Sequence, residues 1–321
     1  MRKVLLALIL SFVSFVMVCP AMAADFPTKA IQLVVPWPPG GGSDLSARIL
    51  GDAVQNKKIL PEPMIVTNIT GAAGLNAANN VLKAGADGYT ILWEHPSNLT
   101  MSPIVANANF RWNDFTLAGA FGYSGVALFV SNKSPWKTAD ELFNHIKSNP
   151  KKVRWALTMN TTGHYQFMQI SDSKGGLDVI QLSLQGDKPK IVSVIGGNSE
   201  TATAAISALD PYVKSGDVRL LATLGSERNE FYPNVPTLKE LGVNCTIEFW
   251  YSALVPKDTP KAVINTIADA IKQAAADPET QAKLKQQFIK AEYMSPEAIT
   301  KFWQETATSV EAVLKRHGKM K

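Results

Sequence analysis

The stretch Ile31-Gln-Leu-Val-Val-Pro-Trp-Pro-Pro-Gly-Gly-Gly-Ser-Asp44 decides the fold class of this chain. Residues 31–35 are mostly apolar and β-branched, which predicts a buried parallel strand. Residues 36–42 predict a Pro/Gly loop, and Ser43 or Asp44 can cap a following helix whose apolar residues recur every four positions. A strand, a glycine loop and a helix in this order predict a βαβ unit and a parallel sheet.

The same alternation of short β-branched runs and helical patterns continues through the chain. A second small-residue loop at 71–74 again precedes a predicted helix, at 76–83. We therefore expect an α/β fold with more than one βαβ unit. The further predicted strands are 64–67, 89–93, 127–130, 153–157, 179–182, 191–195 and 218–223.

Capping signals mark several helix starts. Thr259-Pro260, Asp277-Pro278 and Ser295-Pro296 each place a capping residue directly before a Pro at the first helical position. Thr138 and Glu141 stand at the spacing of a capping box. Each of these four positions predicts the beginning of a helix.

The first 23 residues predict a secretory signal peptide. Arg2 and Lys3 precede an apolar run at 4–18, and Ala21-Met-Ala23 supplies the small-x-small cleavage pattern. The alternative of an uncleaved anchor is less favoured because the run is shorter than the ~20 residues that span a bilayer. We expect export to the periplasm with cleavage near Ala23.

Removal of this segment changes the charge and the cysteine count. The whole chain has 32 Lys+Arg and 27 Asp+Glu, a formal net charge of +5, and loss of two basic residues leaves +3. A mild excess without a basic run argues against nucleic acid as a partner. Cys19 would leave with the signal, and the branched Val18 before it disfavours the alternative of lipidation. Cys245 then remains alone, without a disulfide partner, and is expected to be a buried small hydrophobe.

The glycine loop of the opening stretch is the first candidate ligand site, because parallel α/β sheets bind ligands where their strands end. Gly40, Gly41 and Gly42 lack a Cβ, so backbone N–H groups can approach a ligand closely. The positive end of the following helix lies at the same place, and a carboxylate can be held without Arg or Lys. Ser43 can add a hydroxyl, and Asp44 either contacts the ligand or caps the helix. The structural alternative is a tight turn that needs Gly for its geometry.

A second polar loop follows the predicted strand at 153–157 and precedes a predicted helix at 165–170. It mirrors the glycine loop on what we expect to be the second lobe, and a solvated loop with capping threonines is the alternative. Trp37 and Pro39 in the first loop are expected to line the same pocket. The candidate contacts in the second loop are Thr158, Asn160, Thr161, Thr162 and His164.

Sequence signatures of catalysis are missing. There is no Gly-x-Ser-x-Gly elbow and no phosphate-binding P-loop. The Gly-x-Gly-x-x-Gly pattern fails at Leu45, and the His and Cys residues are too scattered for a zinc signature. We expect no enzymatic activity, no cofactor and no metal site. An exported enzyme with Asp44 or His164 as its base is the alternative.

Several segments together resemble one protein family, over nearly the whole mature chain. They resemble the periplasmic receptors of tripartite tricarboxylate transporters, often called Bug or TctC-like receptors. The matching segments are residues 26–44, Ala86-Asp-Gly-Tyr-Thr-Ile-Leu92, 216–223 with Glu227-Arg228, 233–242, Phe249-Trp250 and 255–260.

The resemblance implies a two-lobed type II periplasmic binding fold, in which each lobe is a sheet flanked by helices and the ligand cleft lies between the lobes. The expected lobes are residues 24–125 plus 247–321, and residues 126–246. Such a receptor captures a small carboxylate-bearing solute by hinge closure and delivers it to the membrane permease subunits of a tripartite transporter. We expect it to act as a monomer. A ligand sensor for a membrane kinase is the alternative.

The resemblance also points to individual residues. Residues 40–44 and 158–164 correspond to family contact regions, and Asn198 stands in the segment where the family has Gly-Gly-Gln-x-Asp. Gly71 and Ala72 belong to a segment, 68–74, that departs from the usual Asn-x-Pro-Gly-Ala-Gly-Gly, and we include both as candidate contacts. The family's Tyr-Lys-Gly is also replaced here, by Leu184-Gln-Gly186. With these departures, the resemblance does not imply that the ligand is a tricarboxylate.

Overall fold

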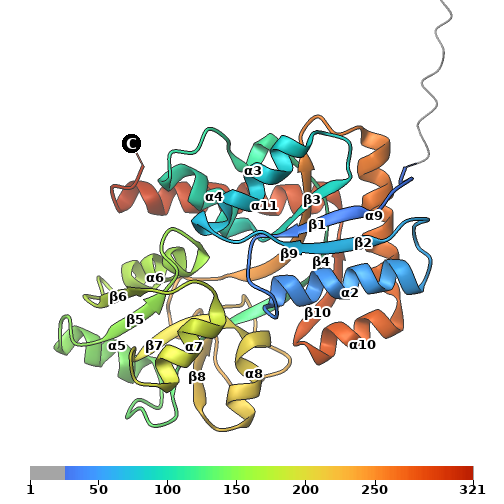
Figure 1. Ribbon diagram of the computed structural model, residues 1–321. Coiled ribbons are helices and arrows are strands. Elements are labelled where there is room, and N and C mark those ends of the chain that lie inside the picture. The colour runs from blue at the N-terminus through green and yellow to red at the C-terminus, as the bar shows by residue number, and fades with distance from the viewer. Residues whose placement is uncertain (1–25, 321) are drawn as a thin grey trace, which may run out of the picture.

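The computed structural model of the chain describes residues 26–320 (Figure 1). The predicted signal peptide, its cleavage position and Cys19 therefore lie outside the described residues. None of the described helices is long and apolar enough to cross a membrane. Helices pack around a ten-stranded sheet network in which the neighbouring strands run in the order β2-β1-β3-β9-β4-β7-β5-β6, while β8 and β10 pair with β4.

The strands are β1 (Ile31–Val35), β2 (Met64–Asn68), β3 (Thr90–Glu94), β4 (Phe115–Ser131), β5 (Arg154–Leu157), β6 (Ile180–Ser183), β7 (Thr201–Ala205), β8 (Val218–Thr223), β9 (Glu248–Pro256) and β10 (Ile289–Met294). The helices are α2 (Gly42–Asn56), α3 (Leu75–Ala84), α4 (Pro96–Val105), α5 (Ala139–Ser148), α6 (Thr162–Ser173), α7 (Asp187–Ile195), α8 (Ile206–Lys214), α9 (Lys261–Ala276), α10 (Pro278–Gln286) and α11 (Pro296–Arg316). Short 3-10 turns lie at Ala72–Gly74 and Trp112–Asp114.

The network has two halves, which we call sheet A and sheet B. Sheet A holds β1, β2, β3, β9, β10 and the first part of β4, and β1 pairs in parallel with both β2 and β3. Sheet B holds β5 to β8 and the last part of β4, and β5 pairs in parallel with β6 and β7. The α/β fold with parallel strands predicted from the opening stretch is confirmed.

Strand β4 is the element that joins the two sheets. Its residues 115–125 pair with β9, and its residues 126–131 pair with β7 and β8. Gly119 and Gly122 have positive φ values of 130° and 74°, and the register with β9 shifts beside them. A Cβ at Gly122 would collide with the Lys290 carbonyl. These irregular positions bend the strand from one sheet into the other, and sequence patterning found only 127–130 of it.

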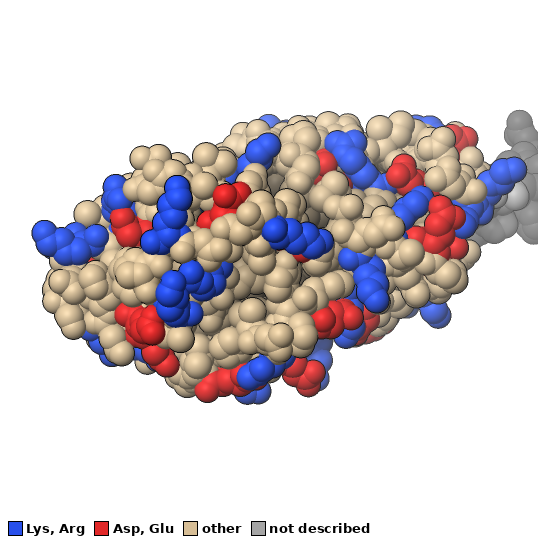
Figure 2. Space-filling model, turned by 90° about the horizontal axis from the view of Figure 1, so that it is seen from below, with Lys and Arg blue, Asp and Glu red and all other residues tan. Residues whose placement is uncertain are grey.

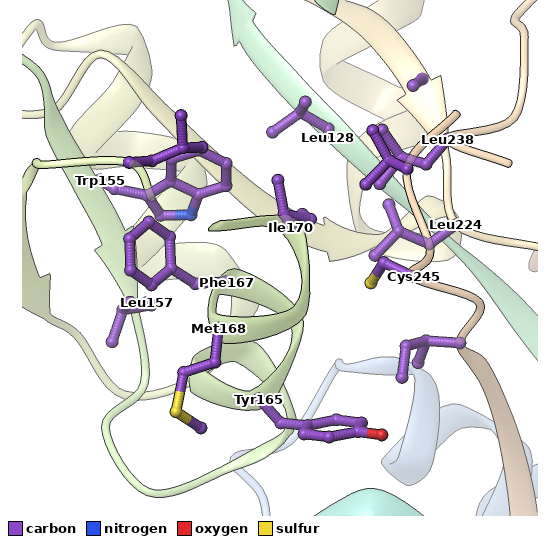
Figure 3. Close-up of a cluster of buried hydrophobic side chains, with 14 of the residues drawn as sticks. Leu128, Trp155, Leu157, Tyr165, Phe167, Met168, Ile170, Leu224, Leu238 and Cys245 are labelled. Atoms are coloured by element: carbon purple, nitrogen blue, oxygen red, sulfur yellow. The ribbon is translucent and has the colours of Figure 1, made fainter. Parts of the chain in front are cut away.

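Helix α11 packs into both halves of the molecule. Ile299 and Trp303, near its start, belong to the core that α3 and α4 form with sheet A. Val310 and Val313, near its end, belong to the core of sheet B that Figure 3 shows around Trp155. The predicted lobe boundaries stay a prediction, and this packing shows that the two halves share one helix.

The sheet B core also contains Cys245. Its thiol is fully buried among apolar side chains, as expected, and burial raises its pKa (Figure 3). Because the thiolate is the reactive form, this environment keeps the sulfur unreactive.

One predicted strand is wrong. Residues 191–195 form the end of helix α7, in which Ile191 and Val194 are buried and Val192 is exposed. A five-residue β-branched run fits a helix face as well as a strand. Gly186, which precedes the helix at its N-cap, was the local sign of a helix start.

The predicted caps are largely confirmed. The side chains of Asp277, Ser295 and Thr138 accept hydrogen bonds from the first turns of α10, α11 and α5. Thr259 does not cap α9, because the N-cap there is Pro260 and the Thr259 hydroxyl donates to the Pro256 carbonyl at 2.7 Å.

Candidate ligand site

A cavity of about 480 Å³ lies where strands β1, β3 and β5 end. Parallel sheets bind ligands at this edge, where the loops after the strands converge. Residues from both sheets line the cavity, so it has the position expected of a cleft between them. Of the predicted contacts, those that line it are Trp37, Pro39, Gly40, Gly41, Gly42, Ser43, Thr158, Thr161 and Thr162.

The other predicted contacts do not line the cavity: Asp44, Gly71, Ala72, Asn160, His164 and Asn198. Asn198 is exposed just beyond the C-terminal end of α7, whereas the cavity meets the start of that helix. Asn160 and His164 contact one another instead, with the Asn160 N–H 3.3 Å from His164 Nδ1. Gly71 and Ala72 lie in the turn before α3.

The glycine loop uses its three glycines for different reasons. Gly40 has a φ of +84°, which favours glycine, and a Cβ at Gly42 would collide with the Tyr251 hydroxyl. Gly41 has an ordinary φ of −86°, and a Cβ there would meet only the Pro38 carbonyl, at 3.9 Å. Turn geometry and close packing therefore explain Gly40 and Gly42 but not Gly41.

Helix α2 begins two residues earlier than an N-cap at Ser43 would allow, and three earlier than one at Asp44. Its N-cap is Gly41, and neither Ser43 nor Asp44 caps it because both lie inside its first turn. The first N–H groups of a helix have no acceptor within the helix. Gly42 and Ser43, in that first turn, line the cavity.

Asp44 holds the loop together from behind. Its carboxylate accepts hydrogen bonds at 2.9 Å from the Gly40 N–H, from Nε and Nη2 of Arg48, and from the Asn68 side chain. Burial alone would raise the pKa of Asp44, but these bonds from Arg48, Gly40 and Asn68 outweigh it and hold the pKa below its usual value. A carboxylate so occupied is a poor general base.

His164, the other base considered from the sequence, is also unsuited to that role. Burial lowers its pKa to about 4, and its side chain does not line the cavity. Neither Asp44 nor His164, the two candidates for the base of an exported enzyme, is therefore placed to act on a molecule in the cavity.

Three aromatic rings that the sequence did not bring together form one wall. The rings of Trp37 and His95 are parallel with centroids 5.9 Å apart, and those of His95 and Phe249 stack at 4.5 Å. His95 follows β3 and Phe249 belongs to β9, so only the fold makes them neighbours. His95 Nδ1 also lies 3.4 Å from the Thr162 hydroxyl, at the start of α6.

Behind this wall, Glu94 is 1% exposed. Its carboxyl accepts hydrogen bonds from Trp37 Nε1 at 3.2 Å, the His95 N–H at 2.8 Å and the Asn98 side chain at 3.0 Å. Burial raises the pKa of Glu94 to about 7 against the effect of these bonds.

The ring of His95 is coupled to this carboxyl, because its Nε2 lies 3.3 Å from Glu94 Oε1. Burial lowers the pKa of His95 to about 4. Between about pH 4 and 7 the two groups therefore hold one proton between them and carry no net charge. An anion in the cavity then meets no net negative charge behind the aromatic wall.

Four helices begin at the cavity. Residues of the first turns of α2, α6 and α7, together with Ala205 and Ala208 at the start of α8, line it. None of these four helices has a hydrogen bond from its N-cap side chain. Each start carries partial positive charge and N–H groups without intrahelical acceptors. The convergence favours a negatively charged ligand.

Part of the outer surface is charged without a preference for one sign. On the face that Figure 2 shows, Lys and Arg are interspersed with Asp and Glu and form no broad basic area.

The fold and this cavity are those of a solute-binding protein. Residues 47–319 match the family described as "Tripartite tricarboxylate transporter family receptor", and the chain belongs to this family. The family resemblance inferred from the sequence is confirmed. A curated relative, the UPF0065 protein in the gbd 5′ region of Cupriavidus necator, is 30% identical over 93% of this chain and 90% of its own length.

Solved structures agree. A TctC solute-binding protein from Polaromonas is 25% identical, covers 91% of this chain and 99% of its own, and superposes with a TM-score of 0.72. MatC from Rhodopseudomonas palustris with bound malate is 22% identical, covers 90% of this chain and 100% of its own, and has a TM-score of 0.82. The second likeness shows the fold alone.

Proposed function

We propose that this chain is a periplasmic solute receptor that binds a small carboxylate in the cavity between sheets A and B. The observation that carries the proposal is the convergence of four helix starts without side-chain caps on one cavity. Backbone N–H groups at helix starts bind carboxylates without a balancing cation. A relative of the same fold is described with bound malate, which is such a carboxylate.

The ligand sits against the first turn of α2 in this proposal, with its carboxylate on the N–H groups of residues 41–43. Ser43 adds its hydroxyl, and Thr158, Thr161 and Thr162 face the ligand from the side of sheet B. The aromatic wall of Trp37, His95 and Phe249 contacts its carbon skeleton. Because backbone amides bind the carboxylate and aromatic rings contact the carbon skeleton, the cavity favours a compact acid with an apolar part over a tricarboxylate.

Export, monomeric state and delivery to membrane permease subunits complete the proposal. The predicted signal peptide supports export, and membership of the receptor family supports the permease partner. Binding draws sheets A and B together by bending at the connections between them, of which β4 is one. Hinge closure of this kind buries the ligand and presents a closed form to a partner.

A ligand screen tests the proposal. Thermal-shift measurements with monocarboxylates, malate, adipate, citrate, aromatic acids and amino acids should show a raised melting temperature for at least one carboxylate, because a ligand that binds only the folded state stabilises it. Calorimetry then gives the dissociation constant. A chain for which no carboxylate raises the melting temperature would contradict the proposed function.

The site is tested by Gly41→Val. The side chain meets open space and an allowed φ, so the fold should stay intact, while the bulk at the N-cap blocks the N–H groups. We expect an affinity loss of about 100-fold, equivalent to two charge-assisted hydrogen bonds at roughly 1.5 kcal/mol each. Ala276→Val, at an exposed position in α9, is the matched control and should bind normally. Unchanged affinity in Gly41→Val would place the ligand elsewhere.

A further inference from the structure

Lys190 is a buried cation in the wall of the cavity. It lies in the first turns of α7, its residue is 5% exposed, and it lines the cavity. Its ammonium contacts Asp187 Oδ1 at 2.8 Å and donates to the Thr203 carbonyl at 2.7 Å. Burying even a paired charge costs the desolvation of both partners, a cost that apolar side chains at these positions would avoid.

The ammonium has a third N–H beyond these two contacts. Gly163, in the first turn of α6, faces it: a Cβ on Gly163 would lie 4.0 Å from Lys190 Nζ and 3.5 Å from the Thr158 backbone nitrogen. Because Gly163 has no side chain, space is left between the ammonium, the Thr158 N–H and the start of α6. The Thr161 hydroxyl, also 4.0 Å from that Cβ position, donates to the Thr158 carbonyl at 2.8 Å.

Asp187 balances the charge of Lys190 from one side. Its other carboxylate oxygen accepts the Ala205 N–H at 3.1 Å, at the start of α8. The negative charge is thereby held toward α8, while the ammonium is the group that faces Gly163. Asp187 and the exposed Lys188 also line the cavity, so on this side two cations face one carboxylate.

We infer that Lys190, with the Thr158 N–H and the first turn of α6, forms a second and charged carboxylate subsite opposite the neutral glycine loop. This inference rests on the proposed function and deepens it. The α2 loop accepts an acid group through neutral donors, whereas Lys190 makes affinity depend on a full negative charge at the other end of the ligand. Lys190 is therefore a residue that determines specificity for ligand charge.

The test compares ligands that differ only in charge. L-malate and its two monoamides have nearly the same size, but each monoamide lacks one ionised carboxylate. In the unmodified chain, malate should bind at least about tenfold tighter than either monoamide. In Lys190→Met, malate should lose at least about tenfold, and the monoamide that lacks the carboxylate at this end should lose less than about threefold. Lys190→Arg, which keeps the charge, should restore most of the preference.

Asp187→Asn should change malate affinity in the opposite direction to Lys190→Met. It removes the balancing charge while keeping an oxygen acceptor for the Ala205 N–H, so malate should bind more tightly. A purely structural ion pair would instead weaken binding in both single variants alike, and that result would overturn the inference. Lys147→Met, at an exposed position on α5, is the control for loss of a lysine and should leave affinity unchanged.

A double variant separates an effect on folding from an effect on ligand binding. If Lys190→Met leaves Asp187 unpaired and fails to unfold cooperatively, the double variant Asp187→Asn with Lys190→Met removes both charges, and it should lose the preference for malate over its monoamides. Equal malate affinity in the unmodified and Lys190 variants would refute the charged subsite while leaving the receptor function standing. Failure of the unmodified chain to bind malate or any other carboxylate would refute both.

Discussion

Helices that begin at the cavity differ from helices that begin elsewhere. Helices α5, α10 and α11 start away from the cavity, and Thr138, Asp277 and Ser295 cap them through their side chains. Helices α2, α6, α7 and α8 start at the cavity without such a bond. The same four backbone donors exist at every helix start, and at these four starts no N-cap side chain competes with a ligand for them.

The helices that begin away from the cavity also show which feature distinguishes the ligand site. Helices α3 and α9 lack a side-chain cap although they begin away from the cavity. A missing cap alone therefore does not mark a ligand site. What distinguishes the cavity is that several such starts meet in it, beside an aromatic wall and a buried lysine.

The largest combined effect on stability and binding is expected from Gly42→Ala, at the start of α2. Its Cβ would collide with the Tyr251 hydroxyl and lie 3.0 Å from the Ser207 hydroxyl, so either the first turn of α2 or the Tyr251 side chain, which also lines the cavity, must shift. We expect a loss of about 1–3 kcal/mol in the free energy of unfolding and at least about a tenfold loss of ligand affinity. Urea denaturation and calorimetry measure the two. Adding Tyr251→Phe removes the colliding oxygen and should restore part of both, whereas absence of any rescue would show that this contact is not the cause.

Glu94→Gln tests the buried carboxyl that lies just before α4, behind the aromatic wall. The pKa of Glu94 is about 7 in the folded state against an ordinary 4.5, so its carboxyl is protonated more readily when folded. Its contribution to stability is full below pH 4.5 and declines as the pH rises toward 7. The free energy of unfolding of Glu94→Gln, relative to the unmodified chain, should therefore increase by about 3 kcal/mol from pH 4.5 to 7.5.

Denaturant unfolding at several pH values provides this measurement. Glu305→Gln, at an exposed position on α11, should show no such trend. A Glu94→Gln difference that stays constant with pH would mean that the carboxyl keeps its ordinary pKa in the folded chain.

The smallest effects are expected at the capped helices. Thr138→Ala and Ser295→Ala each remove an oxygen that accepts a first-turn N–H, at 3.2 and 3.3 Å. Each should lower the free energy of unfolding by about 1 kcal/mol and leave ligand affinity unchanged. Thermal unfolding and calorimetry distinguish the two quantities. Cap variants that weakened binding as much as Gly41→Val would remove the distinction between the two sets of helix starts.

Local patterns predicted much of the fold. Strand β1 was predicted with both of its ends correct, because an apolar run bounded by a proline loop is a strong local signal. The β-branched run at 191–195 misled because it fits a helix face equally well. The first part of β4 escaped detection because Gly119 and Gly122 interrupt its pattern at the places where the strand bends.

The sequence predicted the loops of the candidate site but not the aromatic and cationic side chains that form its walls. The glycine loop has a sequence signature, but His95, Phe249 and Lys190 come from separate elements and meet only in the folded chain. Asp44 was a candidate contact, and its i,i+4 spacing to Arg48 was the available sign that it would be engaged in an ion pair instead.

The most direct test of the account is a crystal structure of the chain with the carboxylate that the thermal-shift screen identifies. We predict carboxylate oxygens within about 3 Å of the backbone nitrogens of residues 41–43, at hydrogen-bond distance. A bound molecule held only by side chains, or seated outside the cavity with the start of α2 left to solvent, would contradict the central claim that helix starts without side-chain caps capture the ligand.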